Sequence, residues 1–158
     1  MIRVCFVCLG NICRSPTAEG VMRQLVESAG LASEVGVDSA GTAGYHAGEP
    51  PDHRSAQAAE KRGIRLAGSA RRFEPSDWGE FEYVLAIDQS VWESLRSGCP
   101  SGSESKLHLL RSFDPGSPPG AGVPDPYYGG DQGFEHVLDL CEAACRGLLG
   151  DIQRRLGR

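Results

Sequence analysis

Segments typical of strands and of helices alternate along most of this 158-residue chain, and that alternation restricts the fold. Helical patterns run onward from Ala18, from Ser55 to Arg62 and from Ser90 to Ser97. Between and around them are four short stretches rich in β-branched and apolar residues, as in buried strands: Ile2 to Val7, Glu34 to Ser39, Tyr83 to Ile87 and Lys106 to Leu110. Such alternation produces parallel strands with right-handed connections. We therefore expect an α/β fold, with a four-stranded parallel sheet flanked by helices on both faces.

The chain length favours a single domain spanning residues 1–158, since this length buries a core without metal or disulfide support. The strongest helical pattern follows Gly129-Gly130-Asp131 and carries one apolar stripe from Phe134 to Leu156. Cys141 and Cys145 lie one turn apart on that stripe. We interpret them as buried core thiols rather than as a metal pair or a redox couple.

Composition limits the kinds of partner that this protein can bind and indicates its cellular compartment. The formal net charge is −5, so the overall field repels an anionic substrate, and any affinity for phosphate has to be local. No basic stripe with interleaved aromatic residues predicts nucleic-acid binding, and no run of apolar residues is long enough to span a membrane. The N-terminus enters a strand pattern at once rather than a signal peptide, and the six cysteines are distributed like reduced thiols. We expect a cytoplasmic monomer.

The run from Cys8 to Pro16 joins the first strand to the first helix and is the candidate functional loop. The spacing of Cys8 and Arg14 is weak support by itself, because cysteine and arginine are both frequent here; its context carries the prediction. Ser15 and Pro16 suit an N-cap and a first helical residue, so amides and the positive end of the helix dipole should converge there. Gly10 and Asn11 tolerate the left-handed backbone that turns amides inward. The sequence thus predicts a phosphate-binding loop with an acidified thiol, that of Cys8, at its floor.

These groups are suited to attack on a phosphomonoester. Cys8 would be the nucleophile, Arg14 would clamp two phosphate oxygens, and the amides from Leu9 to Arg14 would hold the others. Arginine and amides then neutralise the charge, so we expect no metal and no cofactor.

The leaving oxygen needs a proton, and Asp125 is the candidate general acid and base. It follows the loop Asp114 to Pro124, which leaves the carboxyl end of the sheet, where functional crevices lie in such folds. An ordinary Asp-Pro turn is the alternative explanation of this residue. Tyr127 and Tyr128 beside the acid could wall a slot for an aryl substrate, or could only anchor the loop.

Three segments share the features of one known family: Val7-Cys8-Leu9-Gly10-Asn11-Ile12-Cys13-Arg14-Ser15-Pro16, Asp38-Ser39-Ala40-Gly41-Thr42 and Asp125-Pro126-Tyr127-Tyr128-Gly129. Together they resemble the low-molecular-weight protein tyrosine phosphatases, and the likeness runs nearly from end to end. The resemblance implies the same roles for Cys8, Arg14 and Asp125. It further implies a phosphotyrosine protein or peptide as substrate and inorganic phosphate as product.

The resemblance adds further site residues. Ser15 matches a serine that stabilises the thiolate as a leaving group, and Asn11 with Ser39 matches a hydrogen-bonded pair that keeps the loop in shape. Cys13 matches a second thiol that forms a reversible disulfide with the nucleophile under peroxide. The residues that match those flanking the substrate ring are Leu9, Ile12 and Tyr45.

One position departs from the family pattern. Many members carry a histidine where this chain has Gly68, two residues before Ala70. A hydrogen bond that this histidine makes near the phosphate loop is therefore absent or replaced here. Of the four histidines in the chain, only His46 is expected near the mouth of the site.

Three other functions remain open at this point. Thioredoxin-coupled arsenate reductases share the loop but need two further relay cysteines, whereas Cys99 stands alone in its loop. Protein arginine phosphatases use the same scaffold but typically have threonine where this chain has Ile12. A non-catalytic redox or metal-binding module would use Cys5, Cys8 and Cys13, although Cys5 and Cys8 should point to opposite sides of the sheet.

Overall fold

The computed structural model describes residues 1–126 and 130–158. Its strands are β1 (Ile2–Cys8), β2 (Val35–Gly41), β3 (Tyr83–Ala86) and β4 (Leu107–Leu109). Its α-helices are α1 (Arg14–Ser28), α2 (His53–Glu60), α3 (Asp77–Glu80), α4 (Gln89–Ser97) and α5 (Gly130–Arg155). Two short 3-10 helices, η1 (Glu104–Lys106) and η2 (Leu110–Phe113), flank β4.

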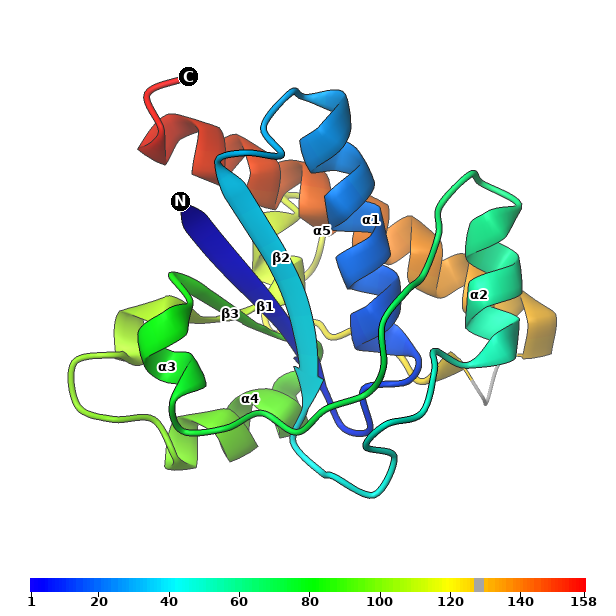
Figure 1. The fold of residues 1–158 in the computed structure, drawn as a ribbon, viewed down its shortest axis with the longest axis horizontal. Helices are drawn as coiled ribbons and strands as arrows, with labels where there is room; N and C mark the ends of the chain where they lie inside the picture. Colours follow the sequence, from blue (N-terminus) through cyan, green and yellow to red (C-terminus); the bar gives the residue numbers. More distant parts are fainter. Residues whose placement is uncertain (127–129) are drawn as a thin grey trace.

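The four strands form one parallel sheet in the order β2-β1-β3-β4. Helices α1 and α5 cover one face, while α3 and α4 lie on the other (Figure 1). The expected architecture is therefore confirmed. The chain moves from β1 outward to β2 and then crosses to β3 on the opposite side of β1, so the strand order reverses between β1 and β3. Ligands of open α/β sheets bind at the carboxyl ends of the strands where this reversal occurs.

The core confirms the apolar stripe of the last helix. Its residues pack against α1 and the sheet and are 5% exposed or less: Phe134, Val137, Leu138, Cys141, Ala144, Cys145, Leu148 and Ile152. Burial raises the pKa of Cys141 to about 12 and also raises that of Cys145. Both cysteines are core thiols, as expected. In the described part of the chain, no helix combines the length and the apolar character that a membrane crossing requires.

The start of α1 differs from the prediction. The helix begins at Arg14 with Cys13 in the N-cap position, and no side chain caps it. Ser15 is therefore inside the first turn rather than at its cap, and it is fully buried. The physical reason lies in tertiary contacts: the Ser15 hydroxyl is used by the neighbouring loop instead of by its own helix.

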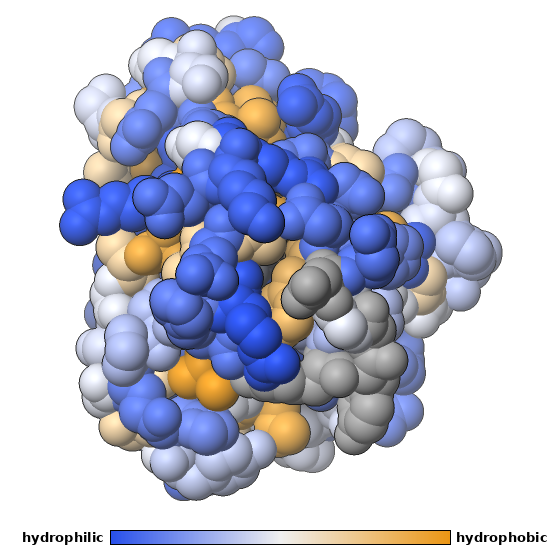
Figure 2. Space-filling view, turned by 90° about the vertical axis from the view of Figure 1, so that its right-hand side faces the viewer, coloured by the Kyte–Doolittle hydropathy of each residue, from blue (hydrophilic) through white to orange (hydrophobic). Residues whose placement is uncertain are grey.

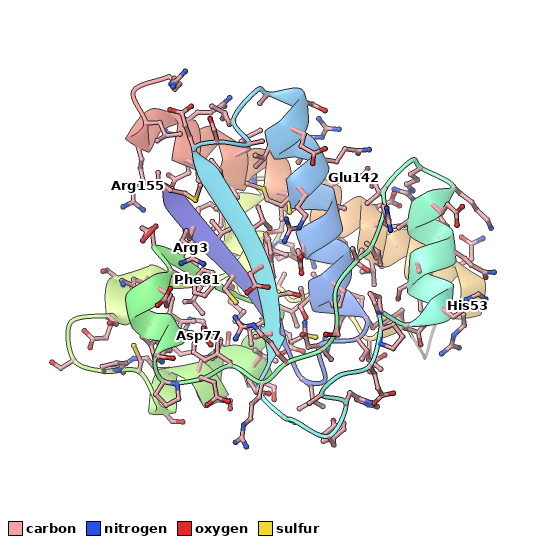
Figure 3. The ribbon with its side chains drawn as sticks, viewed as in Figure 1. Arg3, His53, Asp77, Phe81, Glu142 and Arg155 are labelled. Carbon is pink, nitrogen blue, oxygen red and sulfur yellow. The ribbon has the colours of Figure 1, made fainter. Side chains whose placement is uncertain are left out.

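The segment between α2 and β3 was not predicted to carry structure, and it packs along the edge of β2. Arg72 bridges to Gly41 at the end of β2. The Arg71 guanidinium forms ion pairs with Asp38 at 3.1 Å and with Asp77 of α3 at 2.9 Å (Asp77 is labelled in Figure 3). These two carboxylates raise the pKa of Arg71 against the lowering effect of its burial. These ion pairs thus hold the segment beside the loop that follows β1.

Candidate active site

Cys8 is the last residue of β1, and the loop after it runs into the first turn of α1. Beside this loop is a pocket of about 250 Å³. Most of the predicted site residues line it, together with His46: Cys8, Leu9, Gly10, Ile12, Cys13, Arg14, Tyr45 and Asp125. Residues separated by more than a hundred positions therefore meet at the point where the strand order reverses.

The sulfur of Cys8 is held by two hydrogen-bonding groups. The Ser15 hydroxyl lies 2.9 Å from Sγ, and the backbone amide of Asn11 donates to Sγ at 3.2 Å. Both groups can donate to a negatively charged sulfur and stabilise it. Cys8 itself is only 3% exposed, so the approach to its sulfur is through the pocket.

Asn11 fixes the shape of the loop. Its φ is 58°, and it is the one non-glycine residue with positive φ in the described chain. Its side-chain amide donates to the hydroxyls of Ser15 at 2.8 Å and Ser39 at 3.0 Å, while its Oδ1 accepts from the amide of Arg71 at 3.0 Å. These contacts stabilise a left-handed conformation that costs an L-residue free energy. The side chain of Asn11 thus supports the loop, the role that the resemblance implies for it together with Ser39.

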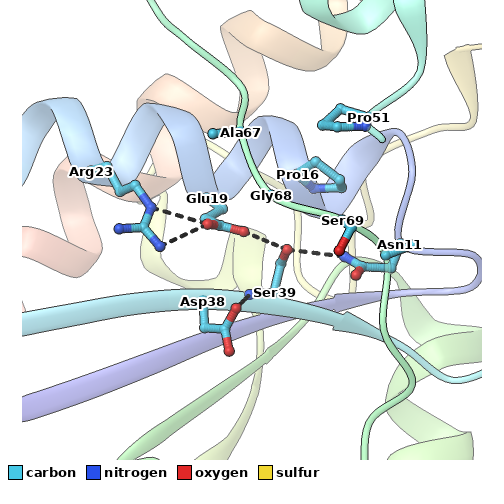
Figure 4. Close-up of a pocket in the computed structure, with 11 residues that line it drawn as sticks. Asn11, Pro16, Glu19, Arg23, Asp38, Ser39, Pro51, Ala67, Gly68 and Ser69 are labelled. Atoms are coloured by element: carbon cyan, nitrogen blue, oxygen red, sulfur yellow. Dashed lines mark hydrogen bonds and ion pairs between the residues drawn. The ribbon is translucent and has the colours of Figure 1, made fainter. Parts of the chain in front are cut away.

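The Asn11 and Ser39 pair continues to a carboxylate that the sequence analysis did not identify. The Ser39 hydroxyl donates to Glu19 of α1 at 2.5 Å, so its oxygen is left to accept from Asn11 (Figure 4). Glu19 also pairs with Arg23 one turn further along α1. Its position on the buried side of the first helical turns could have suggested a structural role, but its partner on β2 is visible only in three dimensions.

Arg14 is oriented by groups from two distant segments. Its Nη1 donates to Asp88 Oδ2 at 2.8 Å and to the carbonyl of Val123 at 2.9 Å. Asp88 lies two residues after the end of β3 and also caps α4, where its Oδ1 accepts from the amide of Val91. The sequence analysis missed Asp88. An acidic residue just after a buried strand, at the carboxyl edge of the sheet, is the signal that could have found it.

The long loop before Asp125 returns to the site as expected. The amide of Val123 donates to the carbonyl of Ile87 at 2.9 Å, and Arg111 donates to the carbonyl of Gly122 at 2.8 Å. These bonds bring Asp125 to the pocket of Cys8. Tyr127 and Tyr128, also predicted to bind substrate, lie outside the described residues.

Gly10 is needed for a different reason than the one predicted. It is not among the glycines with positive φ in the described chain. Instead, a Cβ at this position would lie 2.9 Å from Cδ2 of His46. The ring of His46 covers the loop at Gly10, and its Nδ1 lies 2.6 Å from a carboxylate oxygen of Glu49. His46 is thus at the mouth of the pocket, as anticipated.

Large hydrophobic side chains form part of the rim of the pocket, and Cys13, the second cysteine of the loop, is buried. Leu9 is 49% exposed and Tyr45 is 66% exposed, although both are large hydrophobic residues. Ile12 is partly buried beside them. Cys13 is buried, its Sγ lies 2.9 Å from the Ser55 hydroxyl, and burial raises its pKa to about 12.

Comparison with known proteins agrees with this geometry. Residues 3–157 match the family described as low molecular weight phosphotyrosine protein phosphatase. The chain belongs to this family. A low molecular weight protein-tyrosine-phosphatase of Streptomyces coelicolor is 46% identical over 98% of this chain and 95% of its own. The human low molecular weight phosphotyrosine protein phosphatase is 41% identical over 92% of both chains.

Solved structures of such phosphatases share the fold. A protein tyrosine phosphatase from Entamoeba histolytica superimposes with a TM-score of 0.92 at 37% identity and covers 99% of both chains. YfkJ of Bacillus subtilis gives a TM-score of 0.91 at 40% identity, covering 98% of this chain and 96% of that one. The protein is accordingly an enzyme of the cysteine-dependent phosphatases, as the resemblance indicated.

The thiols of Cys5 and Cys8, which the metal-module alternative would use together, have different neighbours. Arg71 of the segment after α2 lies 3.9 Å from the Cys5 sulfur, whereas the Cys8 sulfur contacts Ser15 of α1. The two thiols therefore contact different elements.

Proposed function

We propose that this phosphatase hydrolyses phosphotyrosine in proteins or peptides, releasing inorganic phosphate through a cysteinyl-phosphate intermediate. The observation that carries the proposal is the arrangement around one sulfur. Ser15 and the Asn11 amide both contact Cys8 Sγ, and Arg14 and Asp125 line the same pocket. Nucleophile, phosphate clamp and proton donor are therefore close enough to act on one phosphate group.

In the first step, the Cys8 thiolate attacks phosphorus and the bond from phosphorus to the tyrosine oxygen breaks. Asp125, in its acid form, gives its proton to that oxygen, so tyrosine leaves neutral. Asp88 and Val123 hold Arg14 through Nη1, and the Nε and Nη2 edge is then the one that can pair with two phosphate oxygens. The amides of the loop at the start of α1 neutralise the remaining charge.

In the second step, water attacks the phosphorus of the thiophosphate and Asp125, now a carboxylate, accepts the proton of that water. The sulfur–phosphorus bond breaks, and the electron pair returns to Cys8 as thiolate. Ser15 stabilises this leaving group, because its hydroxyl accepts from Asn11 and its hydrogen is then available to the sulfur. Phosphate departs, and the starting state is restored.

The lining of the pocket favours an aryl ester. Ile12, Leu9 and Tyr45 offer apolar and aromatic surface next to the loop, on which a phenyl ring can pack. A guanidinium group would prefer a polar wall. This contrast favours phosphotyrosine over phosphoarginine.

The proposal includes reversible oxidation of Cys8, in which Cys13 is the second thiol. Peroxide oxidises the Cys8 thiolate to a sulfenic acid, and the Cys13 thiol then attacks that sulfur, forming a disulfide and releasing water. Both cysteines line the same pocket, which supports this pairing. A thiol reductant restores the enzyme by exchange.

The monomeric state and the cytoplasmic location also belong to this proposal. All six cysteines are free, as in a reducing compartment. On the face formed by α2, hydrophilic side chains prevail and hydrophobic areas are small and separate (Figure 2). Such a face suits solvent better than a permanent partner.

The decisive experiment compares turnover of phosphotyrosine, phosphoserine, phosphoarginine and arsenate by the same preparation. We expect phosphotyrosine to be hydrolysed at least ten times more efficiently than the other phosphates, and arsenate not to be reduced. Cys8→Ser is the matched control: it should lose turnover by about 10⁴-fold or more and still bind phosphate. Preference for phosphoarginine or arsenate, or turnover by Cys8→Ser, would refute the proposal.

A further inference from the structure

Arg111 contacts the loop before Asp125 at two separate points. It lies in η2, just ahead of the loop, and its backbone carbonyl accepts from the Ser117 hydroxyl at 2.7 Å. Its guanidinium donates through Nη1 to the carbonyl of Gly122 at 2.8 Å. One residue therefore holds both the early part and the last part of the loop. None of the steps proposed above involves this residue.

The loop needs such contacts because it has no regular structure of its own. No helix or strand is present from residue 114 to residue 124, and proline and glycine make up most of this segment. Inside it, backbone hydrogen bonds close short turns, such as the one from the amide of Ala121 to the carbonyl of Pro118. A segment of this kind takes its position from contacts with the rest of the molecule.

The end of the loop packs closely against Asp88, the residue that orients Arg14. A Cβ at Gly122 would lie 2.7 Å from Cβ of Asp88 and 2.9 Å from its Cα, which is closer than real Cβ atoms approach. Glycine is therefore required at this point of contact. Asp125 follows three residues later, so a displacement of Gly122 is passed along a short stretch of chain to the proposed general acid.

The remaining contacts of the Arg111 side chain contribute little to stability. None of the ion pairs in the described chain involves this residue. Its Nε is buried and makes no hydrogen bond within residues 1–126 and 130–158. A buried donor without a partner costs free energy, and an apolar side chain would avoid that cost. This favours a role of the guanidinium in activity over a role in stability.

We propose that Arg111 is a positioning residue for Asp125. By joining Gly122 to η2, it places the loop so that the carboxyl group of Asp125 reaches the leaving oxygen of the substrate. This inference rests on the proposed function, in which Asp125 gives its proton to that oxygen. Arg111 is not among the residues that line the catalytic pocket, so it acts through the loop. A misplaced acid slows proton transfer steeply, because the transfer requires hydrogen-bond distance.

Arg111→Met tests the proposal because it removes the donor and keeps an unbranched apolar stem. We expect kcat/KM for phenyl phosphate to fall about tenfold. The value for para-nitrophenyl phosphate should fall by less than about threefold, since its phenolate leaves without a proton. Arg111→Lys keeps a donor on a similar stem and should retain most of the activity on phenyl phosphate. Arg96→Met, exposed on α4, is the matched control and should leave both values unchanged.

The double variant of Arg111→Met with Asp125→Ala separates positioning from a general effect on the fold. If Arg111 acts through Asp125, the double variant hydrolyses phenyl phosphate as fast as Asp125→Ala alone. A residue that only stabilised the fold would lower the activity on both esters equally, and its loss would multiply with that of Asp125→Ala. Either of those results would overturn the proposal.

Ser117→Ala is a second variant, for the case in which thermal unfolding shows that Arg111→Met does not fold. It removes the hydroxyl that joins the loop to the Arg111 carbonyl, so it should give the same selective loss at a smaller size, about threefold. Asp125→Ala by itself reports on the proposed function: a loss independent of the leaving group would refute that function and the positioning role together. If Asp125→Ala shows the dependence but neither Arg111→Met nor Ser117→Ala does, only the role of Arg111 is refuted.

Discussion

Asp88 contacts Arg14 with one carboxylate oxygen and the first turn of α4 with the other. Oδ2 accepts from Arg14 Nη1 at 2.8 Å, and Oδ1 accepts from the amide of Val91 at 2.9 Å. One side chain therefore joins Arg14, the proposed phosphate clamp, to a helix N-terminus. The two roles can be separated by substitution.

Asp88→Asn should keep the helix cap and lose the charge that orients Arg14, since asparagine caps as well as aspartate. We expect kcat/KM for para-nitrophenyl phosphate to fall about tenfold, the cost of one charge-assisted hydrogen bond. The free energy of unfolding should stay within about 0.5 kcal/mol of the parent value. Asp88→Ala should lose the same activity and, in addition, about 1 kcal/mol of stability through the lost cap. Full activity of Asp88→Asn would show that Arg14 needs no such partner.

Asp125→Ala should slow esters according to their leaving groups. A leaving group whose phenol has a low pKa departs as the phenolate without a proton, whereas one whose phenol has a high pKa needs a proton from the acid. We expect a loss of about 10²-fold or more for phenyl phosphate and a much smaller loss for para-nitrophenyl phosphate. The measurement is kcat/KM across a series of substituted phenyl phosphates. An equal loss along the series would exclude Asp125 as the general acid.

Cys13→Ser should change the recovery from peroxide rather than the initial inactivation. Without the second thiol, sulfenic acid at Cys8 cannot be captured as a disulfide and oxidises further. We expect the parent enzyme to regain most activity with dithiothreitol and the variant to regain little. Mass spectrometry should find a crosslink between Cys8 and Cys13 in the parent protein only. Cys99→Ser is the control, and its recovery should match the parent.

His108 should contribute to the pH dependence of stability. It lies in β4, half-buried against Tyr83 and Phe113, and burial lowers its pKa from the ordinary 6.5. Asp151 raises this pKa and Arg155 lowers it, both less than burial does. Below pH 6.5 the unfolded chain therefore binds more protons at this residue than the folded protein.

The free energy of unfolding should accordingly fall as the pH drops below 6.5, by at most about 1.4 kcal/mol per pH unit from this residue. Above pH 6.5 the contribution to the slope should vanish. His108→Gln should flatten the pH dependence of the free energy of unfolding, measured by urea unfolding at a series of pH values below and above 6.5. His136→Gln, exposed on α5, should leave the slope unchanged. Identical slopes for all three proteins would contradict this assignment.

The sequence predicted the sheet and the placement of the loop because both depend on local patterns. The spacing of apolar residues predicts the buried strands and the apolar stripe of α5, and Cys8 comes directly after the strand predicted from Ile2 to Val7. It misplaced the start of α1, because capping preference cannot reveal that Ser15 is recruited by Cys8 and Asn11. It missed Asp88 and Glu19 for a similar reason: their importance comes from partners 74 and 20 residues away.

Sequence alone thus indicated the order of the elements, the candidate nucleophile and the candidate acid, since each lies in a short motif or next to one. The tertiary structure decided how the loop is held: Asn11 keeps its left-handed backbone because Ser15, Ser39 and Arg71 satisfy its side chain together. It also decided that Arg111 contacts the loop before Asp125 at both Ser117 and Gly122. Hydrogen bonds and cavities depend on which distant segments meet, and that is fixed only when the strands pair and the helices pack on them.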